Sequence, residues 1–452
     1  MGRPPDTGQV EAALRAALPP AAKLCVAFSG GRDSTVLLHA LAALRAAHGF
    51  RLRALHVNHG LQAGAGDWAA HCREVAARLG VDCLVREVTV VQGQGKGLEA
   101  AAREARYGAL RDVLGTGEWL LTAHHADDQL ETVLLHLLRG SGPAGLAGIP
   151  ALAPFGAGHL CRPLLNLPGT VMAAYASGQL APAGLAWLDD PMNADLRLDR
   201  AFVRHELGAV LRRRFPAAAA GAGRSAALAG EAAGLLDELA RGDAEGAVDG
   251  ARVSVAALAR LGDARRRNLV RYLVRTRGWP APPERRLRTG LDQLMTPAPG
   301  RQPVVAWGGR EIRRYRDHLH LLDAAVPPGG EPTAPRAWPG GTTLDLGPVR
   351  GRLAWREVAG GGLAPQVVAA GLEVTFRRGG ERVRPDADRH HRTLKFLFQA
   401  RGVVPWMRPH VPLVLGGGRL AAVGDLWVAD WAAAAPGARG LAIAWTGHSP
   451  LE

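Results

Sequence analysis

Short apolar runs alternate with longer amphipathic segments between residues 23 and 139. The runs LCVAF, ALHV, DCLV and WLLT are typical of buried strands, and each leads into a segment whose apolar positions follow helical spacing. Four such strand–helix pairs predict an α/β fold, a doubly wound parallel sheet with right-handed crossovers. Because ligands of such sheets bind at the carboxyl ends of the strands, we expect the site in the segments after Phe28, Val57 and Thr122.

The rest of the chain has a different pattern. Residues 197–320 hold 24 arginines and no lysine against 13 acidic residues, a net charge of +11, and the alanine-rich stretches at 216–241 and 264–277 are typical of helices. Residues 326–341 are dense in proline and glycine, which indicates a linker. Strand-like runs beyond it predict a small mixed α+β domain. The expected organisation is a catalytic domain over 1–215, a helical basic middle domain over 216–325 and a C-terminal domain over 342–452.

Composition narrows the class of protein. The net charge of +14 over 452 residues favours a nucleic-acid partner. The four cysteines are scattered with no C-x-x-C pair, which argues against a disulfide scaffold, a structural zinc site and an iron–sulfur cluster. Free thiols indicate a reducing compartment, and no stretch has the length and apolar character of a membrane span. We therefore expect a cytoplasmic protein with no membrane partner.

The segment SGGRDS lies where the first predicted strand meets the first predicted helix. Its glycines allow backbone amides to approach an anion closely, and the helix directs its positive end to the same point. A carboxylate beside phosphates suits Mg²⁺, so Asp33 is the expected metal ligand. The competing interpretation is a tight turn with a helix N-cap, and the segment is not a Walker loop. The expected phosphate-binding residues are Ser29, Gly30, Gly31, Arg32, Asp33 and Ser34.

This motif resembles the PP-loop of the N-type ATP pyrophosphatases. The resemblance implies that ATP is held by its phosphates, together with Mg²⁺, and is cleaved between its α- and β-phosphates. It also implies adenylation of a carbonyl oxygen and release of pyrophosphate. The loop alone leaves the acceptor of the adenylyl group open.

A second polar motif, AHHADDQLETVLLHLLRG, begins at Ala123. Asp128 and Glu131 are one turn apart on the predicted helix, and His124 is expected one turn before Asp128. Leucines and a valine occupy the opposite face, which directs the polar side chains toward the crevice at the strand ends. Two carboxylates there suit an ammonium group or a metal, but acidic residues also suit the start of any helix, and the pattern favours neither interpretation.

Taken together, several segments resemble the tRNA(Ile)-lysidine synthetase family. Besides SGGRDS they are HVNHGL, LEAAAREARY, HHADDQLETVLLHLLRGSG, CRPLL, WLDDPMN, VRHEL and a C-terminal stretch that begins with RRGGERVRP. The resemblance runs from about residue 23 to residue 427. One departure lies in the C-terminal stretch, where Lys395 is followed by Phe396 instead of a second lysine.

The resemblance implies a reaction in two steps. ATP adenylates O2 of the wobble cytidine in the isoleucine tRNA that bears a CAU anticodon, and free L-lysine then attacks C2 through its ε-amine and expels AMP. His124, Asp128 and Glu131 would bind the lysine ammonium and accept its proton, because an ammonium group is no nucleophile.

Arginines are the implied contacts to the nucleotide and the RNA. Arg103 and Arg106 are placed near the nucleotide or the cytidine, and Arg204 is expected to close over the reaction site or the RNA. A solvated helix surface competes with each of these roles. The middle domain would grip the tRNA backbone. The acceptor stem would be held by Arg378, Arg382, Arg384, Arg392 and Lys395, each of which taken singly is more typical of a solvated charge.

Three other functions compete with this one. A PP-loop enzyme that thiolates tRNA needs cysteines for sulfur transfer, often in the C-x-x-C pattern that is absent here. A synthetase that amidates a small molecule leaves the basic middle segment unexplained. A non-catalytic RNA-binding protein conflicts with the intact phosphate loop. The oligomeric state stays open, a homodimer included.

Overall fold

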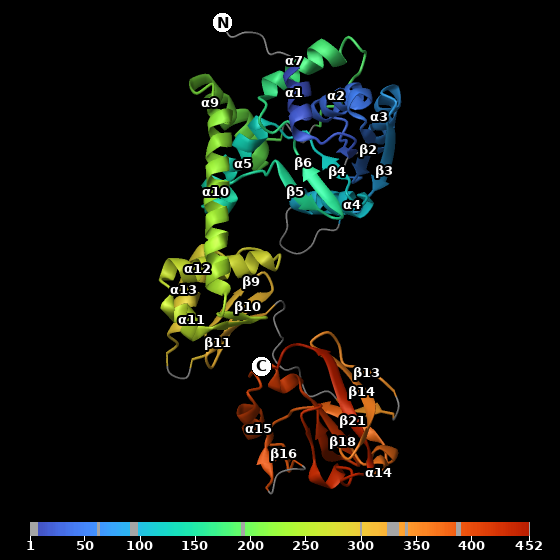
Figure 1. Ribbon diagram of the computed structural model, residues 1–452, viewed down its shortest axis with the longest axis vertical. Helices are drawn as coiled ribbons and strands as arrows, with labels where there is room; N and C mark the ends of the chain where they lie inside the picture. Colours follow the sequence, from blue (N-terminus) through green and yellow to red (C-terminus); the bar gives the residue numbers. More distant parts are fainter. Residues whose placement is uncertain are drawn as a thin grey trace. The chain divides into compact units, whose positions relative to one another are not determined.

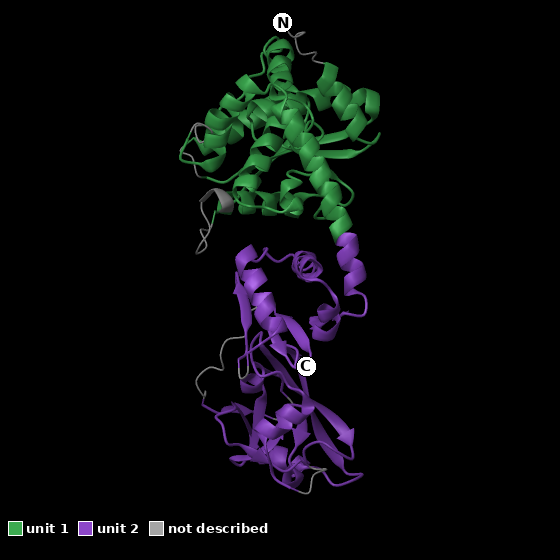
Figure 2. Cartoon of the chain, turned by 90° about the vertical axis from the view of Figure 1, so that its left-hand side faces the viewer, with its two compact units in different colours: residues 1–236 green, residues 237–452 purple. Residues whose placement is uncertain are grey.

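The computed structural model describes residues 8–60, 64–90, 98–190, 195–298, 301–322, 334–339, 342–385 and 390–451, the side chains of 98–100 excepted. The chain divides into two compact units, residues 1–236 and residues 237–452 (Figure 2). The first unit is a sheet with helices packed against it, and the second holds two smaller groups of strands and helices (Figure 1).

A largely parallel sheet forms the centre of unit 1. Its strands are β1 (Lys23–Ala27), β2 (Arg51–Asn58), β3 (Asp82–Glu87), β4 (Trp119–Leu121), β5 (Leu152–Phe155) and β6 (Gly158–Cys161). They lie in the order β3-β2-β1-β4-β6-β5. All neighbouring pairs are parallel except β5 with β6, an edge hairpin that the hydrophobic pattern does not predict.

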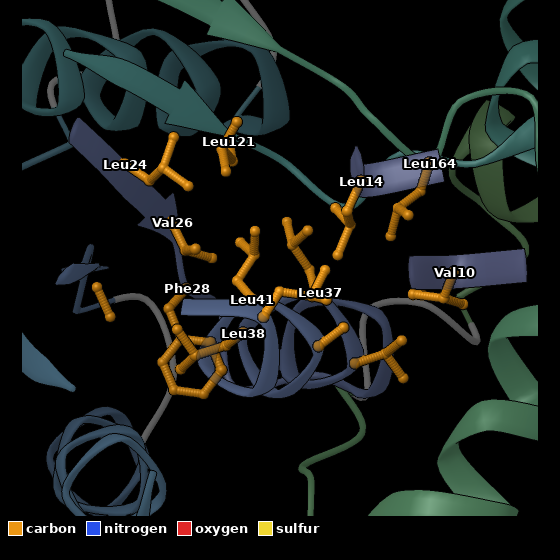
Figure 3. Packing of buried hydrophobic residues seen from close by; sticks show 14 of the residues in the cluster. Val10, Leu14, Leu24, Val26, Phe28, Leu37, Leu38, Leu41, Leu121 and Leu164 are labelled. Atoms are coloured by element: carbon orange, nitrogen blue, oxygen red, sulfur yellow. The ribbon is translucent and has the colours of Figure 1, made fainter. Parts of the chain in front are cut away.

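Helices cover both faces of this sheet. They are α1 (Gly8–Ala17), α2 (Arg32–His48), α3 (Ala65–Arg78), α4 (Leu98–Val113), α5 (Ala126–Leu138), α6 (Pro143–Leu146), α7 (Gly169–Tyr175), α8 (Asp199–Phe202) and α9 (Gly208–Arg214), with π-helical turns η1 (Ala176–Leu180) and η3 (Val203–Leu207). On β1, Leu24 and Val26 pack in one core with Leu37 and Leu41 of α2 (Figure 3), whereas Cys25 packs with α4 in another. Burial on both faces is what a doubly wound sheet requires, and the predicted α/β fold is confirmed.

An ion pair ties β2 to the start of β4 across the intervening β1. Arg53 donates from Nε and Nη2 to the two carboxylate oxygens of Glu118, each at 2.6 Å, and Glu118 accepts the backbone N–H of Gly115 at 2.9 Å. Glu118 is 7% exposed. Burial by itself would raise the pKa of Glu118, but the hydrogen bonds from Arg53 and Gly115 outweigh burial and lower that pKa. The folded state therefore favours the charged carboxylate.

Glu118→Gln is expected to lower the free energy of unfolding by about 2 kcal/mol at neutral pH, because Arg53 loses its charged partner while remaining partly exposed. Since the pKa of Glu118 is lower in the folded than in the unfolded chain, this stabilisation is complete above the ordinary glutamate pKa. It disappears as the pH falls through the lowered value. The melting temperatures of wild type and variant should therefore become equal at acidic pH. Glu231→Gln, an exposed position, is the control, and equal melting temperatures at neutral pH would contradict the prediction.

The middle of the chain combines helices with a sheet. The helices are α10 (Ala218–Ala244), which continues from unit 1 into unit 2, α11 (Val255–Arg260), α12 (Asp263–Thr276) and α13 (Glu284–Met295). The strands are β7 (Val248–Asp249), β8 (Arg252–Ser254), β9 (Val304–Trp307), β10 (Arg310–Tyr315) and β11 (His318–Leu322), in the order β7-β8-β11-β10-β9. The predicted helices are confirmed by α10 and α12, but the sequence pattern missed this antiparallel sheet. The predicted domain limits stay a prediction.

Many arginines of this part stabilise the fold. Ion pairs join Arg265 to Asp243, Arg271 to Glu284 and Arg275 to Asp237. Arg314 donates to the carbonyl oxygens of Leu294 and Met295 at the end of α13, at 2.8 and 2.6 Å. A cation near a helix C-terminus is favourable because the last carbonyl groups lack partners in the helix. The number of arginines in this segment therefore overstates how many are available to a partner.

The C-terminal part is mixed α+β, as predicted. Strands β12 (Arg336–Trp338), β15 (Leu372–Phe376), β18 (Pro412–Gly416), β19 (Arg419–Val423) and β20 (Trp427–Val428) form one sheet in that order. Strands β13 (Leu344–Asp345), β14 (Arg350–Ala359) and β21 (Arg439–His448) form a second, and β16 (Arg382–Val383) pairs with β17 (Arg392–Thr393). Two helices, α14 (Pro365–Ala369) and α15 (Leu394–Arg401), complete it. Trp338, Leu353, Phe398 and Val414 lie in its core.

Two further expectations concern connecting and apolar segments. The predicted linker at 326–341 is wrong where it can be compared with the structure, because its residues 336–338 form β12, which pairs with β15. Residues 323–333 and 340–341 lie outside the described residues. Within the described ranges, the structure contains no helix with the length and hydropathy needed to cross a membrane.

Candidate active site

The segment after β1 forms a tight loop that enters α2. Gly30 has a φ of +79°, and Gly31 is the extended residue before the first turn of α2. Ser29 Oγ and Ser34 Oγ lie 3.0 Å apart, and Ser34 Oγ and Thr35 Oγ1 each donate to the carbonyl oxygen of Gly31 at 2.9 Å. These bonds fix the loop around the start of the helix, where unpaired backbone N–H groups attract an anion.

Gly30 is the position in this loop where a side chain cannot fit. A Cβ atom there would lie 2.8 Å from Cys72 Sγ and 2.9 Å from Trp68 Nε1, in addition to the cost of the left-handed φ. Trp68 in turn donates from Nε1 to the carbonyl oxygen of Ser29 at 2.6 Å. The wall formed by α3 therefore sets the position of the loop.

Gly30→Ala is expected to displace the loop and to reduce pyrophosphate release about 100-fold, because the donors no longer point to one place. Gly60→Ala is the matched control, since Gly60 has a φ of +65° and a Cβ atom added there would meet no other atom within 4 Å. The Gly60 variant should keep its activity. Its free energy of unfolding should fall by only about 1 kcal/mol, the cost of a left-handed φ for a residue with a Cβ atom. Equal activity of the Gly30 and Gly60 variants would contradict the steric argument.

Asp33 lies in the first turn of α2 between Arg32 and His125. Its Oδ1 accepts from Arg32 Nε at 2.9 Å, and its Oδ2 is 3.5 Å from Nε2 of His125. Burial would raise the pKa of Asp33, but His125 and Arg32 outweigh burial and lower it. The carboxylate is therefore charged at neutral pH.

His125 connects this loop to the second motif. It is the N-cap of α5, where its Nδ1 accepts from the N–H of Asp127 at 3.3 Å and its backbone N–H donates to Asp128 Oδ2 at 2.9 Å. Its Nε2 also lies 3.6 Å from Asp128 Oδ2. One imidazole ring therefore faces the carboxylates of both motifs.

Asp128 and Glu131 point into the same cluster of charges as Arg200 and Arg204. Arg204 donates from Nε to Glu131 Oε1 at 2.6 Å and from Nη2 to Asp128 Oδ1 at 3.0 Å. Arg200 donates from Nε to Glu131 Oε2 and from Nη2 to Asp128 Oδ1, both at 3.0 Å. Burial would raise the pKa of Asp128, but His125, His124 and Arg200 lower it on balance. Both carboxylates lie one turn apart, as the spacing predicts.

His124 is not on the helix, contrary to the expected spacing. α5 begins only at Ala126 because His125 caps it, and His124 lies in the preceding segment with its Nδ1 2.8 Å from Thr122 Oγ1. Burial lowers the pKa of His124 to about 3, overriding the opposite effect of Asp128. The imidazole is therefore neutral at pH 7 and is only a weak base there.

Arg103, Arg106 and Tyr107 form another wall of the site, and Arg162 lies outside the cavity lining. The guanidinium groups of Arg103 and Arg106 lie 4.8 and 5.6 Å from the ring centre of Tyr107. Burial lowers the pKa of Arg106 and of Arg162, and Arg103 adds a like charge beside each. Buried cations that repel one another favour an anionic ligand.

One cavity of about 900 Å³ joins these groups. Its lining includes Ser29, Gly31, Arg32, Asp33, Ser34, Arg103, Arg106, His124, Asp128, Arg200 and Arg204. Of the expected site residues, Gly30 and Glu131 do not line the cavity themselves, although Gly30 adjoins Gly31 and Glu131 pairs with Arg200 and Arg204, which do. A phosphate loop, an acidic pair, a neutral imidazole and arginines thus share one space, which suits phosphate chemistry next to an amine.

Comparisons with known proteins identify the family to which this chain is similar. Residues 7–211 match the family model of the PP-loop domain, residues 254–320 that of the TilS substrate binding domain, and residues 372–445 that of the TilS substrate C-terminal domain. A tRNA(Ile)-lysidine synthase of Alkalilimnicola ehrlichii is 48% identical over 94% of this chain and 94% of its own length. One of Methylococcus capsulatus is 41% identical over 96% and 98%, and one of Coxiella burnetii is 37% identical over 88% of each chain.

The chain belongs to the tRNA(Ile)-lysidine synthase family. The PP-loop match spans every residue described in the cavity, so the site of this lysidine synthase lies within unit 1.

Sequence reasoning missed His125 and Arg200 in this lysidine synthase. Arg200 is 69 positions from Glu131 and 72 from Asp128 along the chain, so no local spacing could have linked them. A signal for His125 did exist, since the residue directly before a helix whose first turn is acidic is the N-cap.

Only some of the C-terminal arginines that were expected to hold the acceptor stem lie on neighbouring elements. Arg382 and Arg392 lie on neighbouring strands, with Arg382 opposite Thr393 in the register. Arg384 forms an ion pair with Asp430, which reduces its value as an RNA contact. The guanidinium of Arg392 lies 5.1 Å from the ring centre of Phe396.

Proposed function

We propose that this lysidine synthase uses ATP to join the ε-amine of free L-lysine to C2 of the wobble cytidine in the isoleucine tRNA with a CAU anticodon. The observation that carries the proposal is the shared cavity, which is lined by the loop around Asp33, by Asp128 and by the two arginines that pair with Glu131. A phosphate site and an ammonium site must adjoin if one cytidine base is adenylated and then attacked by an amine.

In the first step O2 of the cytidine attacks the α-phosphorus of ATP, and the bond to the β-phosphate breaks to release pyrophosphate. The backbone N–H groups of Gly31 and its neighbours and the hydroxyls of Ser29 and Ser34 bind the phosphates. Arg103 and Arg106 are proposed to balance charge that develops on the transferred group.

Asp33 is the proposed ligand of Mg²⁺. The described residues contain no cluster of three or more His, Cys, Asp or Glu side chains suited to a metal. A single carboxylate still fits this ion, because Mg²⁺ commonly takes one or two carboxylates and completes its shell with phosphate oxygens and water. When bound, Mg²⁺ would supply positive charge to the phosphates of ATP.

In the second step the ε-amine attacks C2, and the bond between C2 and O2 breaks so that AMP leaves with that oxygen. Asp128 and Glu131 bind the incoming ammonium group, which replaces part of the pairing with Arg200 and Arg204. The proton that the ammonium must lose before attack is proposed to pass to the carboxylates of this acidic pair, beside which His124 lies as a neutral ring. Arg204, released from the acids, would then lie next to the leaving phosphate.

The partners follow from the same proposal. The substrate tRNA would contact the middle and C-terminal parts through exposed arginines such as Arg285 and Arg382. We propose a cytoplasmic enzyme, and the homodimer stays a prediction that light scattering can test.

A thiolation enzyme fits the structure less well. Cys25, Cys72 and Cys161 are buried, and burial raises the pKa of each thiol, to about 12, 12 and 11. A sulfur carrier needs an accessible thiolate at neutral pH. These three cysteines are therefore structural side chains.

The test supplies ATP, Mg²⁺, labelled lysine and unmodified isoleucine tRNA, followed by digestion of the RNA and mass measurement of its nucleosides. Lysidine in place of the wobble cytidine is the expected product. Pyrophosphate release without lysine incorporation would refute lysine as the nucleophile, and bound tRNA without any turnover would point to a non-catalytic RNA-binding protein.

A further inference from the structure

An exposed phenylalanine stands out on α15 of the C-terminal part. Leu394, Leu397 and Phe398 of this helix are buried in the core, so the helix presents its other face to solvent. Phe396 lies on that solvent face and is 50% exposed. Leaving a phenylalanine side chain half in water forgoes much of the stabilisation that burial would give it, so packing within the described fold does not account for it.

One contact to the ring and one hydrogen bond to the backbone position Phe396. The Arg392 guanidinium lies 5.1 Å from the ring centre, and the backbone N–H of Phe396 donates to Oγ1 of Thr393, the N-cap of α15, at 3.3 Å. Arg392 and Thr393 belong to β17, whose pairing with β16 fixes them (Figure 1 shows β16 beside α15). Phe396 and Arg392 thus form a flat aromatic and cationic surface on ordered elements, and this pair of side chains is called the platform.

The charge around the platform is positive. Arg382, opposite Thr393 across the ribbon, adds a cation beside it. The nearest described acid on this ribbon, Glu381, accepts the backbone N–H groups of Arg378 and Gly379 and pairs with Arg377, so its charge is neutralised locally. A stacking ring among cations is the combination that binds single-stranded nucleic acid.

We infer that the platform of Phe396 and Arg392 stacks on an unpaired base at the 3′ end of the substrate tRNA. Bases inside a double-stranded stem are already stacked and present only their edges, so an aromatic ring needs an unpaired nucleotide. The 3′ end is the unpaired segment next to the acceptor stem, which is the part of the tRNA expected at the C-terminal arginines. The inference rests on the proposed function, since it takes tRNA as the substrate.

The test compares binding of the full-length protein to intact isoleucine tRNA and to the same tRNA with its unpaired 3′ nucleotides removed. Phe396→Ala is expected to weaken binding of the intact tRNA about tenfold, and Phe396→Trp to preserve it. Trimming should weaken wild-type binding by a similar factor and should abolish the difference between wild type and Phe396→Ala. The dependence of Kd on salt should stay the same in the variant, because a ring neutralises no phosphate.

Controls separate this contact from other causes. Val304→Ala changes another exposed apolar side chain of unit 2 and should leave binding unchanged. Equal loss on intact and trimmed tRNA, or no loss on either, would overturn the inference. A change of oligomeric state in light scattering would instead place Phe396 at a contact between copies of the chain, and would overturn it as well. Lysidine formation by the wild type, measured in parallel, shows whether the proposed function itself has failed.

Discussion

Asp33→Asn is expected to reduce pyrophosphate release by about 1,000-fold while leaving the fold intact. The amide keeps the size of the carboxylate, and its single oxygen can still accept from Arg32 or from His125, but it removes the negative charge that would hold Mg²⁺ against the phosphates of ATP. Electrostatic groups that act on a developing charge in a closed site commonly contribute factors of about 100 to 1,000 each. A metal that depends on one protein carboxylate should lie at the upper end of that range.

Release of pyrophosphate from ATP in the presence of tRNA is the direct measurement, because it reports the first step without lysine. Asp67→Asn is the matched control, since Asp67 is an exposed carboxylate in the first turn of α3 and Asp33 lies in the first turn of α2. Raising the Mg²⁺ concentration should restore part of the activity of the Asp33 variant but leave the control unchanged. A loss below about tenfold would contradict the assignment of Asp33 as the metal ligand.

The architecture of unit 1 was predictable because its signals are local. Each strand is a short apolar run and each helix a periodic one, so β1 and α2 could be located from residues 23–49 alone. The loop between them follows from the same local chemistry, since the φ of +79° at Gly30 strongly favours glycine. The antiparallel sheet β7-β8-β11-β10-β9 in the middle of the chain carried a weaker signal of this kind. Its strand β10 buries Ile312 fully but otherwise contains mostly polar residues, a pattern typical of a solvated surface.

The site was predictable only in part for a related reason. Asp128 and Glu131 could be paired because they share a helix face, whereas the partners that balance their charge come from η3 and α8, far along the chain. Periodicity places a residue on a face, but it does not say which distant element covers that face. The sequence therefore indicated the acids. Only the fold shows that Arg200 and Arg204 pair with them and that the His125 ring lies between Asp128 and Asp33.

Glu131→Gln is expected to separate the two steps of the reaction. Pyrophosphate release should stay within a few fold of wild type, because Asp33 and the loop are untouched, whereas kcat/KM for lysine should fall about 100-fold. The reason is the balance of charge. Two carboxylates face two guanidinium groups in the cluster, so removing one negative charge leaves Asp128 to hold both arginines and leaves too little negative charge for an ammonium group.

Lysine titrations at saturating ATP and tRNA, with pyrophosphate and lysidine measured in the same reaction, test this directly. Glu74→Gln, an exposed glutamate of α3, controls for the general loss of a charge. If both products fell in parallel, Glu131 would serve to hold the η3 segment in place rather than to bind lysine. If pyrophosphate continued to form while lysidine did not, the acidic pair would be the amine site, because adenylation would proceed in a cavity that had lost only its affinity for the second substrate.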